Sequence, residues 1–311
     1  MPVLFNGIGS ITGFDGLMCV WCLRGGRMSF EQTLKKYWLQ LSVTGVLLVV
    51  LYWRIVPDMV LQWKQDENYS HGFLVPLIAG YFLWQSWPEL KDKAVAPSNW
   101  GFVVLVLGLL QLLVAWVGTE FFTMRSSLIV LIAALILLLF GWQMLKEMAL
   151  PIGYLIFMVP IPYIIYDMVA FPLKLFVTKV SVWFLQLCGV IVMREGNIIM
   201  FPSTTLEVAD ACSGIRSILS LLALAVAYSF FIQIPAKFRV LIILMALPIA
   251  VFTNALRVIV TGFLAQWWGA KAAEGFFHEF AGLAVFALAM VLLVGLGVLL
   301  KKLSSEKEVQ A

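Results

Sequence analysis

One cysteine in the second half of the chain has the setting of a reactive thiol. Cys212 lies in the polar segment 211–214, directly before an apolar stretch, so the sequence predicts that it stands at a helix N-terminus. The partial positive charge of a helix N-terminus lowers the pKa of a thiol, and Arg216, one turn further on, adds to that effect. Since the thiolate is the nucleophilic form, we predict that Cys212 is a nucleophile.

A second candidate, Arg257, lies within a long apolar stretch. Asn254 stands three residues before it and Thr261 four residues after it, so the three side chains form one polar face of a helix. An arginine on such a face can bind a carboxylate or stabilise an oxyanion. The alternative is that Arg257 is a membrane anchor whose guanidinium reaches toward water.

The chain contains two histidines. A lone histidine near a membrane surface is usually structural, but His278 beside a thiol would be the natural general base. His71, in the segment 69–73, is expected on the same side of the membrane, where it either lines the same cleft or is structural. Asp210 and Ser213 flank Cys212 and are lower-ranked supporting positions.

The composition identifies the kind of protein that must position these residues. Of the 311 residues, 62% are hydrophobic and 12% are charged, and the mean hydropathy is +0.99. A soluble domain is roughly 45–50% apolar and 25% charged, so a soluble enzyme is excluded. The net charge of +4 is too small to indicate a nucleic-acid partner. We therefore predict an all-α polytopic membrane protein.

Apolar stretches separated by polar breaks predict eight transmembrane spans, since a crossing helix needs about 20 residues. The intervening segment 166–213 is different, because it contains an apolar stretch, 177–192, that begins near Lys174 and Lys179. The two lysines favour an interfacial or re-entrant helix over a ninth span. The eight predicted spans are 38–56, 72–87, 100–118, 126–145, 148–165, 215–233, 238–262 and 280–300.

Eight spans place both termini on one side of the membrane. That side carries more than half of the 21 lysines and arginines, so the positive-inside rule predicts cytoplasmic termini. The expected organisation is a cytoplasmic tail over residues 1–36, a transmembrane domain over 37–300 and a second cytoplasmic tail over 301–311. The composition changes at Met28, which we expect to be the native start.

Helix geometry predicts the depth of the polar residues in the bilayer. Arg257 follows Lys237 by 20 residues, which is about 30 Å of helix, or one full hydrocarbon thickness from the cytoplasmic face. His278 precedes Lys301 by 23 residues, so it also belongs at the outer face. Cys212 comes just before the sixth span on the same side. We therefore expect Cys212, Arg257 and His278 to share one membrane level.

The sequence contains no metal or cofactor signature. Two histidines without a paired cysteine motif are poor material for a zinc site, and no phosphate-binding or dinucleotide-binding glycine pattern is found. Cys19 and Cys22 form a single CxxC pair, and four cysteines at irregular spacing predict no disulfide framework. Cys188, within an apolar stretch, is expected to be buried and inert.

Several of these segments together resemble one enzyme family. Residues 208–217, residues 254–257, and His278 with Gly282 are similar to the exosortase and archaeosortase signature. The resemblance covers roughly residues 37–300, and three earlier segments are also similar to exosortases: 70–76, 159–162 and 194–198.

The resemblance implies a cysteine peptidase or transpeptidase of the bacterial inner membrane, with its active site facing the periplasm. Its substrates would be exported proteins with a C-terminal sorting signal, made of a Val-Pro-Glu-Pro-like motif, a transmembrane helix and a basic tail. Cleaved proteins would be transferred to an acceptor, a lipid or a polysaccharide. Cys212 matches the family nucleophile, Arg257 its essential arginine and His278 the third active-site position.

Two other functions remain open from the sequence alone. A transporter or lipid-glycan flippase would need polar residues near the bilayer midplane and interrupted helices in paired repeats, whereas the polar residues here gather at one face. A membrane acyltransferase would use His71 or His278 to activate a hydroxyl substrate.

Overall fold

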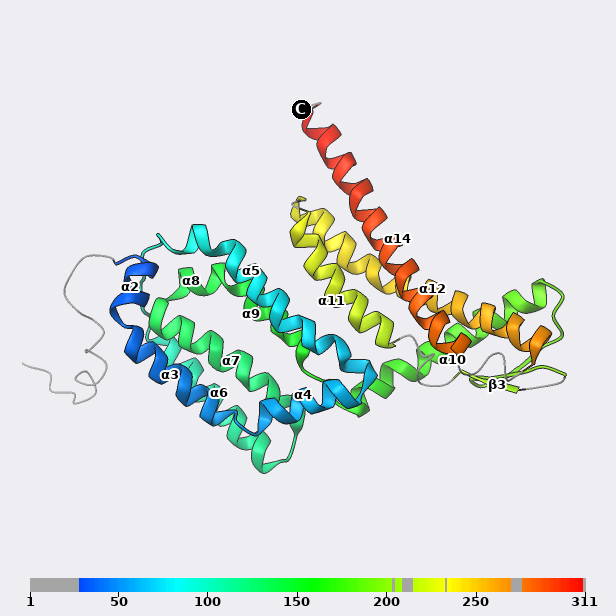
Figure 1. The fold of residues 1–311 in the computed structure, drawn as a ribbon, viewed down its shortest axis with the longest axis horizontal. Coiled ribbons are helices and arrows are strands. Elements are labelled where there is room, and N and C mark those ends of the chain that lie inside the picture. The colour runs from blue at the N-terminus through cyan, green and yellow to red at the C-terminus, as the bar shows by residue number, and fades with distance from the viewer. Residues whose placement is uncertain (1–27, 203–204, 209–214, 233, 270–275, 310–311) are drawn as a thin grey trace, which may run out of the picture.

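The computed structural model describes residues 28–202, 205–208, 215–232, 234–269 and 276–309 (Figure 1). Most of these residues are helical, which confirms the prediction of an all-α polytopic protein. The first half contains α2 (Phe30–Lys36), α3 (Trp38–Leu51), α4 (Ile55–Gln65), the 3₁₀ helix η1 (Glu67–Phe73), α5 (Leu74–Leu90), α6 (Trp100–Val117), α7 (Phe121–Phe140), α8 (Trp142–Glu147), α9 (Ala149–Tyr154) and the 3₁₀ helix η2 (Leu155–Met158).

The second half combines long helices with one small sheet. Three of its helices, α11, α12 and α14, pack against one another and lie together in Figure 1. Its elements are α10 (Tyr163–Leu187), β1 (Met193–Glu195), β2 (Ile198–Met200), β3 (Thr205–Glu207), α11 (Ile215–Phe231), α12 (Ala236–Trp268) and α14 (Phe276–Val309).

The exterior of the helices is apolar, as expected for a protein surrounded by lipid. Leu47 and Val50 on α3 and Val114 on α6 are 63%, 66% and 69% exposed. Within the described residues, five helices are long and apolar enough to cross a bilayer, or up to six if the bent pair α2–α3 forms one span. The five are α6, α7, α10, α12 and the Phe280–Ser304 part of α14.

The predicted number of eight spans is therefore not confirmed. The predicted spans 100–118 and 238–262 correspond to the single helices α6 and α12. In contrast, α5 and α11 are each 17 residues long, shorter than the five. The predicted span 126–145 ends earlier, because the chain turns at Gly141, whose φ is +89°.

The predicted span 148–165 is not one helix. Helical structure ends at Met158, and the chain is non-helical until α10 begins at Tyr163. Pro160 and Pro162 explain the break, because proline has no N–H and disfavours helix in the residue before it. Two side chains bind backbone carbonyls at this break: Trp63 Nε1 donates to Met158 O at 2.8 Å, and the Tyr69 hydroxyl donates to Ile161 O at 3.0 Å.

Helix α10 contains residues 177–187 of the segment 177–192, which was expected to be interfacial or re-entrant. Its 25 residues are long and apolar enough to span a bilayer. In Figure 1, however, it runs in a different direction from α11, α12 and α14 and passes across their lower ends. The interfacial or re-entrant position of this segment stays a prediction, because the length and composition of α10 equally suit a membrane span.

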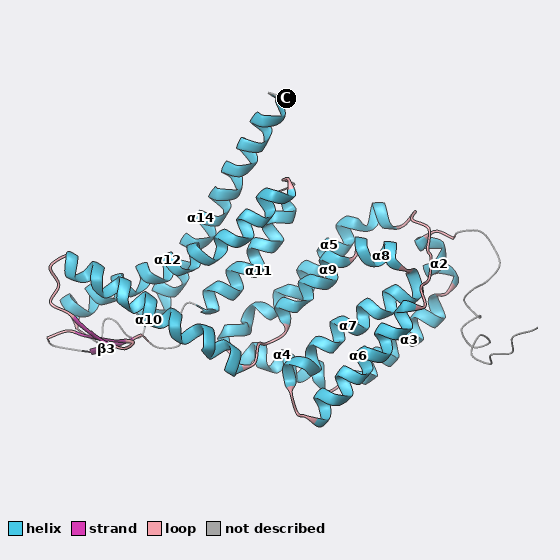
Figure 2. Cartoon of the chain, turned by 180° about the vertical axis from the view of Figure 1, so that it is seen from behind, coloured by secondary structure: helices cyan, strands magenta, loops and turns pink. Residues whose placement is uncertain are grey.

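The three strands form an antiparallel sheet in the order β1-β2-β3, next to α10 (Figure 2). Gly196, with φ +61°, occupies the turn between β1 and β2. The buried face of the sheet includes Ile199, which belongs to one apolar cluster with Leu185 of α10 and Val258 of α12. The sheet thereby fixes the chain shortly before residues 209–214, which lie outside the described residues.

Candidate active site

One cavity, of about 630 Å³, brings together η1, α5, α11, α12 and α14. Three of the residues singled out from the sequence line it: His71, Arg216 and Arg257. The chain segments that meet here are separated by up to about 200 residues in the sequence. The described residues of its lining are Glu67, Ser70, His71, Leu74, Arg216, Ser217, Ser220, Arg257, Gly282, Leu283 and Phe286.

Arg257 projects from α12 toward α14. Its Nη2 atom lies 3.4 Å from the point where a Cβ at Gly282 would be, so the absence of a side chain lets the guanidinium approach the backbone of α14. The neighbouring positions on the same face, Asn254 and Thr261, are 2% and 6% exposed. The polar stripe expected from the sequence therefore faces protein and not lipid, which is the usual orientation of such residues in membrane helices.

Arg216 occupies the first turn of α11 and binds η1. Its Nη1 donates to Glu67 Oε2 at 2.5 Å and its Nε donates to Asn68 Oδ1 at 3.3 Å. From the sequence, Arg216 is expected to favour a thiolate at residue 212. The negative charge of Glu67 beside the guanidinium weakens the effect of Arg216 on the thiol pKa. In the structure, Arg216 instead attaches α11 to η1.

His71 lies on η1, outside the candidate membrane spans. Its Nδ1 is 3.4 Å from the Ser220 hydroxyl of α11. Burial lowers the pKa of His71, opposed in part by backbone hydrogen bonds involving Phe157 and Asn68. The imidazole is therefore neutral at neutral pH and able to accept a proton.

The path of η1 depends on two local features. The Asp66 side chain accepts a hydrogen bond from Asn68 N at 2.9 Å and so caps the first turn. Gly72 packs against the indole of Trp63, where a Cβ would lie 2.5 Å from Nε1. These contacts, together with the binding of Trp63 to Met158 O, hold His71 against α11.

Three predicted site residues, Asp210, Cys212 and Ser213, lie outside the described residues. Helix α11 begins at Ile215, three residues after Cys212, in agreement with the helix start expected there. His278 is the third residue of α14, and its backbone stands one helical turn before Gly282; the structure does not describe its side chain.

The predicted burial of Cys188 is wrong. It is the C-cap residue of α10 and is exposed, because α10 ends at Leu187 and the chain turns away at Gly189, where φ is +83°. Within the described parts of the chain, no three His, Cys, Asp or Glu residues gather as a metal site would require.

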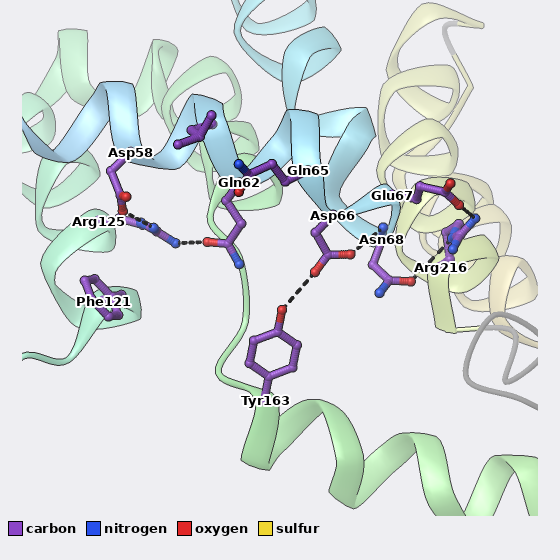
Figure 3. A pocket seen from close by; sticks show the side chains of 11 residues that line it. Asp58, Gln62, Gln65, Asp66, Glu67, Asn68, Phe121, Arg125, Tyr163 and Arg216 are labelled. Carbon is purple, nitrogen blue, oxygen red and sulfur yellow. Dashed lines mark hydrogen bonds and ion pairs between the residues drawn. The ribbon is translucent and has the colours of Figure 1, made fainter.

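A second polar cavity, of about 820 Å³, adjoins the first (Figure 3). The two share Glu67 and Arg216 in their linings. Sequence reasoning missed most of this cavity, including Arg125, Asp58 and Gln62. The available signal was the concentration of polar residues in the segment 58–71, between two apolar stretches.

The comparison with known families decides the classification. The profile of the transmembrane exosortases matches residues 63–295, about three quarters of the chain. The chain belongs to the transmembrane exosortase family. The match includes the whole lining described for the first cavity and all three predicted catalytic positions of this exosortase, whereas Asp58, Leu61 and Gln62 of the second cavity precede it. No curated protein and no solved structure matches the chain.

Proposed function

We propose that this exosortase is a cysteine peptidase and transpeptidase that removes C-terminal sorting signals from exported proteins and passes the new C-terminus to an acceptor. It acts at the periplasmic face of the inner membrane, with both termini in the cytoplasm. The observation that carries the proposal is the shared cavity of Arg257, Arg216 and His71, next to the helix start that follows Cys212.

The chemistry follows from the residue types. The Cys212 thiolate attacks the carbonyl carbon of the scissile peptide bond. Arg257 stabilises the oxyanion that forms, and His278 delivers a proton to the departing amine. The products of this step are a thioester on Cys212 and a free amine on the released signal. An acceptor hydroxyl or amine, or water, then breaks the C–S bond and restores the thiol.

Asn254 and Thr261 have positioning roles in this proposal. Both are buried beside Arg257 on the face of α12 that points toward protein. His71 contacts Ser220 and is neutral at neutral pH, so it is a second base at the same cavity. Ser213 and Asp210 are assigned to substrate binding near the nucleophile.

The experiment is a processing assay in cells that express the enzyme with a signal-bearing substrate. Cys212→Ala is expected to abolish processing, whereas the matched control, Cys188→Ala, should leave it at the wild-type rate. A membrane-impermeant maleimide applied from the periplasmic side should label Cys212. Processing at the wild-type rate by Cys212→Ala would contradict the proposal and favour the acyltransferase alternative. Substrate-dependent translocation of a lipid-linked glycan without cleavage would favour the transporter.

A further inference from the structure

The second polar cavity has a lining that fits a ligand of its own. It lies between α4, η1, α7 and α10 and is the cavity drawn in Figure 3. Its lining is Asp58, Leu61, Gln62, Gln65, Asp66, Glu67, Asn68, Phe121, Arg125, Tyr163 and Arg216. The mechanism proposed above uses none of these residues directly.

The cationic side chains of this cavity are matched by carboxylates. Arg125 Nη2 binds Asp58 Oδ2 at 2.7 Å, and Arg216 Nη1 binds Glu67 Oε2 at 2.5 Å. Asp66 adds a third carboxylate, so the described residues of the lining contribute three acidic and two basic groups. A phosphate or another anion would meet no excess of positive charge here, which argues for a neutral ligand.

Arg125 provides the observation that points most directly to a ligand. Its side chain is 6% exposed, and its Nη1 donates to Gln62 Oε1 (Figure 3). Its Nε is buried and has no hydrogen-bond partner among the described residues. Because an unsatisfied buried donor is costly, Arg125 would be stabilised by a hydrogen-bond acceptor entering from the cavity that this residue lines.

The remaining groups are neutral amides, a phenol and an aromatic ring. Gln65 offers a carbonyl and an NH₂, and Gln62 and Asn68 add NH₂ groups, because their carbonyl oxygens already accept hydrogen bonds from Arg125 and Arg216. The Tyr163 hydroxyl donates to Asp66 Oδ2 at 3.0 Å, and the ring of Phe121 lies 5.4 Å from Arg125 Cζ. Hydroxyl groups on a compact carbon ring match this set, because each hydroxyl donates and accepts while the ring carbons pack on aromatic surface.

We propose that this cavity binds the saccharide portion of the acceptor. The inference rests on the proposed function, since an acceptor is needed only if a thioester forms. The Arg216–Glu67 pair lines both cavities, so a saccharide held in the second cavity would lie beside the start of α11. The start of α11 follows the proposed nucleophile closely in the sequence. The saccharide hydroxyl adds to the thioester carbonyl; the C–O bond forms, the C–S bond breaks, and the hydroxyl proton passes to the departing thiolate.

The first test measures how the products are partitioned. Purified enzyme in nanodiscs is given a signal-bearing peptide and N,N′-diacetylchitobiose, and mass spectrometry quantifies the hydrolysed and saccharide-linked products. Gln62→Ala and Gln65→Ala should each lower the ratio of transferred to hydrolysed product by roughly three- to tenfold. Gln40→Ala, an exposed glutamine on α3 away from both cavities, is the matched control and should leave the ratio unchanged. An unchanged ratio in the Gln62→Ala/Gln65→Ala double variant overturns the proposal.

The second test does not require activity and so separates this inference from the proposed function. A diazirine-bearing diacetylchitobiose is photolysed with wild-type enzyme, and the labelled peptides are mapped. The label should fall within residues 58–68 and 121–125. Unlabelled disaccharide should reduce the labelling, and the Cys212→Ala variant should be labelled as the wild type is. Labelling elsewhere, or loss of the label to inorganic phosphate but not to disaccharide, contradicts the saccharide site. A second probe carries a polyprenyl tail. If the saccharide is presented on a lipid, this probe should label the same residues at a lower concentration than the probe without the tail.

Discussion

The guanidinium of Arg257 lies against Gly282, a position of α14 where the chain has no side chain. The Nη2 atom is 3.4 Å from the place a Cβ would occupy there, and Nη1 is 3.8 Å from it. A single Cβ at this distance makes an ordinary contact, but any longer side chain would meet the guanidinium. Gly282 therefore sets where Arg257 can point, and the two residues couple α12 to α14 at the candidate active site.

A substitution series at Gly282 tests this coupling. Gly282→Ala should process substrate at nearly the wild-type rate, whereas Gly282→Leu should lower the rate on the order of a hundredfold, because it displaces Arg257. The measurement is the initial rate of signal cleavage by purified enzyme. Gly295→Leu, on the same helix with nothing within 4 Å of its Cβ position, is the control and should retain activity. Equal rates for the two leucine variants would show that Gly282 does not position Arg257.

The Glu67–Arg216 pair should control the ionisation of the proposed nucleophile. Glu67→Gln removes a negative charge beside Arg216, so the cation is freed to stabilise a thiolate and the pKa of the Cys212 thiol should fall. The rate of iodoacetamide labelling at Cys212 would then reach half its maximum at a lower pH than in wild type. A shift to higher pH contradicts the account. Because the Glu67 side chain is 76% exposed, the loss of the pair should change the melting temperature little.

The buried imidazole of His71 should make stability depend on pH. Burial lowers the folded-state pKa of His71, so the unfolded protein binds more protons below the ordinary histidine pKa of 6.5. The free energy of unfolding therefore decreases as the pH falls from 6.5 to the lower pKa of His71 in the folded state, and His71 causes no further decrease below that pH. Replacing His71 with Gln should flatten this part of the curve. Melting temperatures of both proteins at pH 7.5 and pH 5.5 provide the comparison, and equal losses in both would contradict it.

The Tyr69 hydroxyl should be important for the break between η2 and α10. Tyr69→Phe leaves Ile161 O without its 3.0 Å hydrogen bond in a largely apolar setting, at a cost of about 1–3 kcal/mol of unfolding free energy. The measurement is denaturant-induced unfolding in detergent. Tyr81→Phe, whose ring is 43% exposed on α5, removes a hydroxyl with no hydrogen bond among the described residues and should cost much less. Equal losses for the two would argue against an anchoring role.

Periodic and compositional features were predictable, because they depend on residues close together in the sequence. Continuous apolar stretches gave α6 and α12, and the polar segment ending at Gly214 gave the start of α11. The span predicted over 148–165 was wrong, because hydropathy measures only how apolar a segment is and takes no account of the helix-breaking effect of Pro160 and Pro162. The sheet was missed because strands of three residues leave almost no alternation pattern.

The site was predictable in part. Asn254, Arg257 and Thr261 could be placed on one protected face because helix periodicity is regular. The pairing of Arg216 with Glu67, and of Arg125 with Asp58, depends on how distant helices pack, and no local pattern encodes it. Arg216 was consequently assigned to the thiol alone, and the second cavity was not anticipated.

Direct capture of the acyl-enzyme tests the central claim most sharply. Purified enzyme is mixed with a signal-bearing peptide, quenched in acid within the first turnover and digested for mass spectrometry. The account predicts that the peptide containing Cys212 gains the mass of the N-terminal substrate fragment, that hydroxylamine removes it, and that Arg257→Gln greatly reduces it. Processing of the substrate at the normal rate with no adduct on Cys212, or with the adduct on another residue, would contradict the account.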